Sequence, residues 1–136
     1  MQQAIIQGAH IFQKANTASL FDVATGQNLR DTLRANRGAA VGLAANMIGQ
    51  NKRIIAFFDD NGQIQVMYNP EITAKNDTYS AQEGCLSLLG ERSVTRYQAI
   101  TVTWQDAQFV SHGADFSGYT AEIIQHEIDH LNGIII

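Results

Sequence analysis

The stretch Gln125-His126-Glu127-Ile128-Asp129-His130 is the segment around which we expect the fold to be organised. On an α-helix, His126 and His130 lie one turn apart on the same face, so both imidazoles can reach one metal ion. Glu127, one position round the helix, can reach a water molecule held on that ion. The alternative is a pair of hydrogen-bonded core histidines. Burial favours the metal site, because unpartnered histidines in a buried helix are costly. The helix is predicted to be buried by its apolar residues Ile123, Ile124, Ile128 and Leu131.

Composition sets the class of protein. A chain of 136 residues with 45% hydrophobic and 16% charged residues predicts one globular domain over residues 1–136. A net charge of −4 without basic blocks argues against nucleic acid as a partner. The apolar runs are too short to span a bilayer, and the start of the chain lacks the basic region of a signal peptide. One cysteine excludes an internal disulfide, so we expect a cytoplasmic protein without a membrane partner.

The spacing of apolar residues predicts an α+β fold with antiparallel or mixed β-sheets packed around the C-terminal metal-binding helix. A helix is predicted over residues 20–36, although Gly26 weakens the case for one continuous helix. Asn69-Pro70 is expected to end a strand, and the glycine-rich residues 113–118 to form a polar break before the last helix. The predicted extended segments are residues 53–59, 63–68, 72–80, 94–104 and a short piece at Phe109-Val110.

The single cysteine lies in Glu83-Gly84-Cys85-Leu86-Ser87. A catalytic metal requires three protein ligands, the histidine pair supplies two, and a thiolate is a strong soft donor. Cys85 is therefore a candidate third ligand, and Gly84 lets the backbone approach the site. A small buried hydrophobe and a Cys–His nucleophile are the alternatives. Glu83 is either a group that orients a ligand or a solvated surface charge.

Residues 40–50, Ala-Val-Gly-Leu-Ala-Ala-Asn-Met-Ile-Gly-Gln, are small and almost uncharged. Such a run fits tight backbone packing or a pocket wall that a ligand approaches closely, and the sequence gives both interpretations equal weight. It lacks the pattern of a phosphate-binding loop.

Together these segments resemble the peptide deformylase family. The matching motifs are Gly-Leu-Ala-Ala at 42–45, Glu-Gly-Cys-Leu-Ser at 83–87 and Gln-His-Glu-x-Asp-His-Leu-x-Gly at 125–133. The resemblance implies a hydrolase of protein biosynthesis and N-terminal methionine processing, which removes the formyl group from formyl-methionyl nascent polypeptides. The ribosome is a candidate place of encounter. The implied cofactor is one divalent metal, Fe²⁺ with Zn²⁺, Ni²⁺ or Co²⁺ as substitutes, held by Cys85, His126 and His130.

The resemblance also implies roles for individual residues. Glu127 would move the proton of the attacking water, and the backbone N–H of Leu86 would donate to the oxyanion. The methionine side chain would enter an apolar pocket. The implied substrate-binding positions are Val41, Gly42, Met47, Gly84, Arg92 and Ile123.

One departure affects the oxyanion site. Met47 stands where the family has a glutamine donor, and a thioether cannot donate a hydrogen bond. Asn46 is the nearest replacement donor. Three functions stay open: a working, slow deformylase; a deformylase-like protein that binds peptides without turnover; and a general metallopeptidase. The Cys ligand and the small predicted pocket argue against the last.

Overall fold

The computed structural model describes residues 1–136. It contains two α-helices and one five-stranded sheet in the order β1-β2-β3-β4-β5, with every neighbouring pair antiparallel. This confirms the predicted α+β class, with an antiparallel sheet and not a mixed one. The helices are α1 (Val23–Ala35) and α2 (Gly118–Leu131), and the strands are β1 (Gly42–Ala44), β2 (Ile54–Phe58), β3 (Ile64–Gly84), β4 (Glu91–Gln105) and β5 (Ser111–Ser117).

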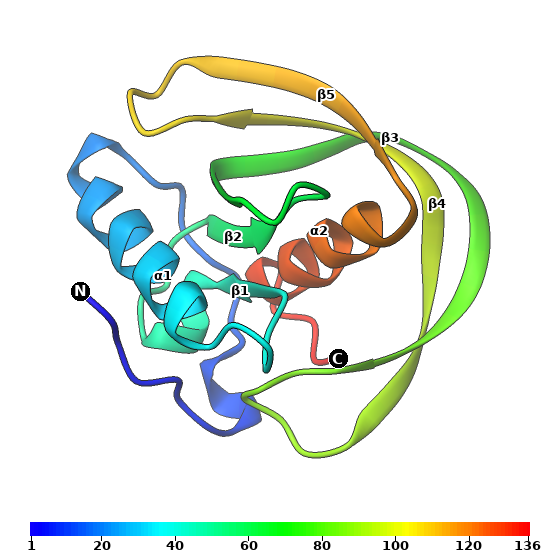
Figure 1. Ribbon diagram of the computed structural model, residues 1–136, viewed down its shortest axis with the longest axis horizontal. Coiled ribbons are helices and arrows are strands. Elements are labelled where there is room, and N and C mark those ends of the chain that lie inside the picture. The colour runs from blue at the N-terminus through cyan, green and yellow to red at the C-terminus, as the bar shows by residue number, and fades with distance from the viewer.

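Helix α2 lies in the middle of the molecule (Figure 1). The long strands β3 and β4 curve around one side of it, and β1, β2 and α1 lie on the other. The helix contacts β1, β2, β4 and β5, and ten of its fourteen residues are buried. Because α2 is enclosed on several sides, its buried polar side chains, among them His126, Glu127 and His130, need partners inside the protein. No helix in the structure combines the length and the apolar character that crossing a bilayer requires.

Strand β3 corrects the prediction that Asn69-Pro70 ends a strand. β3 continues through both residues, and the register with β4 shifts between Tyr68 and Glu71. Asn69 has a positive φ of 52°, and its side chain bonds the backbone of Ala18. Proline lacks an N–H for the ladder, but a bulge leaves it outside the ladder without interrupting the strand.

Strand β5 corrects the prediction of a polar break at residues 113–118. Residues 111–117 pair with β4 throughout, whereas Phe109, with a φ of 60°, belongs to the preceding turn. β5 is an edge strand with one solvated face, so its polar residues are compatible with pairing. Half-buried Ala114 and Phe116 alternate with exposed neighbours, which is the period of two typical of such a strand.

Two local features of the backbone differ from the simplest expectation. Helix α1 runs without interruption through Gly26, because the ring of Tyr68 packs where a side chain would be. The chain then passes from β1 into a 3-10 helix, η3 (Ala45–Ile48), not into a longer strand. Met47 is therefore carried by a tight helical turn at the end of β1.

Candidate active site

Three potential metal ligands converge at the centre of the molecule. Cys85 lies just after β3, and His126 and His130 lie on α2, with one ligand atom of each within 4.8 Å of the others. Both histidines are buried, and His130 is fully enclosed. The Nε2 atoms of the two histidines face each other at 2.9 Å. The i, i+4 spacing thus places both rings against one point, as the helical period dictates.

The opposite nitrogen of each ring has its own partner. Nδ1 of His126 lies 2.7 Å from Oε1 of Glu83, and Nδ1 of His130 lies 3.2 Å from the carbonyl oxygen of Ile134. Both partners accept hydrogen bonds, so both Nδ1 atoms are donors, and both Nε2 atoms face inward toward Cys85. Two Nε2 atoms at this distance need a proton or a metal cation between them. Two imidazoles and a thiolate are a suitable donor set for a divalent transition metal.

The pKa shifts of the two histidines place a proton on His126. Burial lowers the pKa of His126, but hydrogen bonds to Cys85 and Glu83 outweigh it and raise the pKa to about 10. Burial and the neighbouring His126 lower the pKa of His130 to about 3. A proton is therefore favoured on His126 and disfavoured on His130. A divalent cation competes with that proton for the same Nε2 lone pairs.

A buried ionic network supports His126. Glu83 accepts two hydrogen bonds from Arg96, at 2.9 and 2.7 Å, and Arg96 also bonds Asp129 of α2 at 2.5 Å. Burial raises the pKa of Glu83, but the bonds from His126 and Arg96 outweigh it and lower the pKa to about 2. Glu83 is thus a buried carboxylate that orients His126. The sequence suggested this role for Glu83 but gave no signal for Arg96.

Glu127 lies against the backbone of β1. A Cβ added to Gly42 would come within 3.0 Å of Oε2 of Glu127, so only glycine permits this approach. Glu127 is 4% exposed, and its Oε1 has no hydrogen-bond partner. Burial raises its pKa to about 7. Such a carboxyl group can accept and release a proton near neutral pH.

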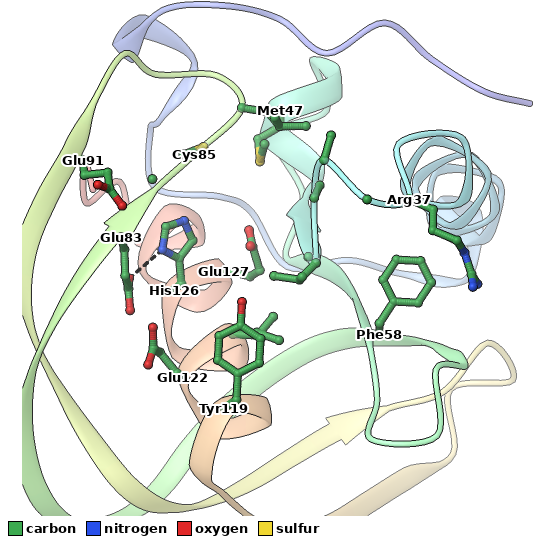
Figure 2. A pocket seen from close by; sticks show the side chains of 18 of the residues that line it. Arg37, Met47, Phe58, Glu83, Cys85, Glu91, Tyr119, Glu122, His126 and Glu127 are labelled. Carbon is green, nitrogen blue, oxygen red and sulfur yellow. Dashed lines mark hydrogen bonds and ion pairs between the residues drawn. The ribbon is translucent and has the colours of Figure 1, made fainter.

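A cavity of about 750 Å³ opens beside these groups. Figure 2 shows Glu127 and His126 in its interior, with Met47 and Cys85 on one side and Tyr119 on the other. Of the residues expected to bind substrate or supply the oxyanion donor, six line it: Val41, Gly42, Met47, Gly84, Leu86 and Ile123.

Arg92 is the expected binding residue that the structure does not bring to the cavity. Its guanidinium bonds the carbonyl of Leu89 at 3.3 Å. It pairs across the sheet with Glu83, but neighbouring Glu91 reaches the cavity instead. Sequence reasoning missed several lining residues, because they come from four separate segments: Arg37, Phe58, Glu91, Tyr119 and Glu122.

Asn46 does not replace the missing glutamine. Its side-chain amide donates to the carbonyl of His130 at 2.8 Å, and the residue does not line the cavity. In the 3-10 turn, Asn46 faces α2 while Met47 faces the cavity. The prediction that Asn46 could serve as the second oxyanion donor is therefore wrong.

Known proteins match this chain over most of its length. The sequence profile described as polypeptide deformylase matches residues 6–136. A peptide deformylase of Clostridium beijerinckii is 49% identical over 124 residues, which cover 91% of this chain and 90% of that protein. The crystal structure of a peptide deformylase from Thermotoga maritima has a TM-score of 0.88 at 29% identity, covering 99% of this chain and 95% of that one. A class I type b peptide deformylase from Acinetobacter baumannii, solved with Met-Ala-Ser bound, has a TM-score of 0.86 at 27% identity, covering 99% and 97%.

Proposed function

The chain belongs to the peptide deformylase family, metal-dependent enzymes that remove the formyl group from formyl-methionyl nascent polypeptides, and we propose that its catalytic metal is held by Cys85, His126 and His130. The observation that carries this proposal is the inward-facing set of two imidazole nitrogens and one thiol. We further propose Fe²⁺ as the native ion. When bound, the ion polarises the formyl carbonyl and lowers the pKa of a water molecule.

Glu127 is the proposed proton carrier. Its burial and raised pKa support this role, because a carboxyl group with a pKa near 7 both takes up and returns a proton at neutral pH. Glu127 takes one proton from the water whose oxygen attacks the formyl carbon. It returns that proton to the amine nitrogen as the C–N bond breaks, so the products are a free N-terminal amine and formic acid, which ionises to formate at neutral pH.

The backbone N–H of Leu86 is the proposed donor to the developing oxyanion. Leu86 lines the cavity and follows Cys85 directly, so its N–H belongs to the peptide next to the thiol. Met47 lines the same cavity and supplies no donor. Removal of one such donor typically costs about 10²–10³-fold in rate. We therefore expect a working but slow enzyme.

The cavity wall supports binding of an extended N-terminal peptide. Exposed Val41 just before β1 and exposed Gly84 at the end of β3 present backbone at the cavity wall, and Ile123 adds an apolar surface for the methionine side chain. Backbone groups of this kind recognise any sequence, which suits an enzyme that acts on many polypeptides. We propose that these are nascent chains in the cytoplasm, met at the ribosome.

The experiment that tests this function is formate release from a formyl-Met-Ala-Ser peptide. Protein purified without oxygen and loaded with iron should hold about one metal per chain and release formate. The same peptide without its formyl group, assayed for cleavage, separates a deformylase from a general metallopeptidase. Binding of the formyl peptide without formate release would overturn the proposal in favour of peptide binding alone.

A further inference from the structure

The N-terminal arm, residues 1–8, lies beside two segments of the proposed oxyanion site. Figure 1 shows this dark blue segment running close to the connection between β3 and β4. The N–H of Ile6 donates to the carbonyl of Met47 at 2.9 Å, and the N–H of Gly8 donates to the carbonyl of Ser87 at 2.8 Å. The arm therefore joins the two segments without contributing to the cavity wall itself.

The segment that carries Leu86 is a β-turn. The N–H of Leu88 donates to the carbonyl of Cys85 at 3.1 Å, which places Leu86 and Ser87 at the two central positions. The peptide between two central residues can rotate, because turn types I and II differ mainly in its orientation. That rotation changes ψ of Leu86 and φ of Ser87. The Leu86 N–H, the proposed oxyanion donor, belongs to the adjoining Cys85–Leu86 peptide, so its orientation depends on the whole turn being held in place.

Gln7 holds this central peptide. Its side-chain amide donates to the carbonyl of Leu86 at 2.7 Å, from a position 79 residues away in sequence. Gly8, the next residue, holds the following carbonyl of the same turn. Gly8 has a φ of 109°, and a Cβ there would contact the ring of His10 at 2.8 Å. Glycine at this position therefore lets the Gln7 side chain and the Gly8 N–H both donate to the turn.

We propose that Gln7 is a positioning residue for deformylation, which fixes the Cys85–Leu88 turn so that the Leu86 N–H faces the oxyanion. The inference rests on the proposed function, in which Leu86 supplies that donor. Because Met47 provides no second donor, the rate depends on the orientation of this one N–H. Oriented donors act mainly in the transition state, so the effect belongs in kcat and not in KM.

Three variants test the proposal. Gln7→Met keeps the chain length and removes the donor, Gln7→Lys restores a donor, and Gln2→Met is the matched control on the same arm, because the Gln2 side chain has no hydrogen bond. At equal metal content, we expect Gln7→Met to lower kcat about fivefold, the scale of one lost hydrogen bond. KM should stay within about twofold. Gln7→Lys should recover much of the rate, and Gln2→Met should match the wild type.

Amide hydrogen exchange of residues 85–91 supplies a reading that does not depend on activity. Gln7→Met should speed exchange in this segment and not in α2. A wild-type kcat in Gln7→Met, an equal loss in Gln2→Met, or a change in KM alone would overturn the positioning role. If the wild type releases no formate, the proposed function fails, and amide exchange alone decides whether Gln7 holds the turn. Faster exchange of residues 85–91 in Gln7→Met would then support this role, and unchanged exchange would overturn it.

Discussion

The substitution Gly42→Ala tests how closely the position of Glu127 is set. A Cβ at residue 42 would lie 2.8 Å from Cγ2 of Ile123 and 3.0 Å from Oε2 of Glu127, whereas ordinary contacts begin at 3.4 Å. Backbone strain does not complicate the change, because Gly42 is not among the glycines with positive φ. The added methyl group must therefore displace the two side chains.

The expected effect follows from these distances. Ile123 must move by about 0.6 Å and the Glu127 carboxylate by about 0.4 Å to restore ordinary contact. A misplacement of about 1 Å can cost about 10²-fold in rate, so a shift near half that size corresponds to about tenfold in kcat. Overpacking of a buried site should also lower the free energy of unfolding by about 1–3 kcal/mol. Metal content should not change.

The assay is formate release at saturating peptide, with metal content and thermal stability measured on the same preparations. Gly113→Ala is the matched control, because a Cβ there meets nothing closer than 3.8 Å. A kcat for Gly42→Ala within twofold of the wild type would contradict the expected displacement of Glu127. A higher KM with unchanged kcat would also refute it, since the methyl group would then block the peptide without moving Glu127.

Three further outcomes follow from the same geometry. Cys85→Ser should weaken metal binding, measured as metal retained after dialysis against a chelator, because serine is a poor replacement for a thiolate. Met47→Gln should raise kcat by up to about 10²-fold with less change in KM. Because Met47 is 1% exposed, the cost of burying an amide will reduce this gain in kcat. Equal and fast rates in both proteins would mean that another group already supplies the donor. Arg96→Met should lower metal affinity by about 10–100-fold and the free energy of unfolding by about 3–5 kcal/mol. The reason is that it leaves the Glu83 carboxylate buried without the Arg96 guanidinium. Unchanged metal affinity and unchanged stability would argue against the network.

Parts of this site could be read from the sequence because their signal is local. The His126–His130 spacing follows from the helical period, so helix and convergence come from one short segment. Gly84 and Cys85 gave a weaker signal, since a lone cysteine is compatible with several roles. The family resemblance then linked Cys85 to a histidine pair about forty residues away.

Other parts depend on pairings that no local pattern encodes. Arg96 reaches Glu83 only because β3 and β4 form a long curved hairpin, and nothing around Arg96 distinguishes it from a surface charge. Asn46 faces α2 instead of the cavity because the chain enters a 3-10 turn, which directs adjacent side chains differently from a strand. β5 was missed because glycine and serine have low strand propensity, and edge pairing with β4 overrides it.

We propose that Glu127 moves the proton while Cys85, His126 and His130 hold the metal. The most direct test of this proposal is formate release by Glu127→Gln at a metal content equal to that of the wild type. Glutamine keeps the size of the side chain and cannot take up the proton, so turnover should fall by at least about 10³-fold while about one metal per chain remains. Turnover near the wild-type rate at full metal content would contradict the claim.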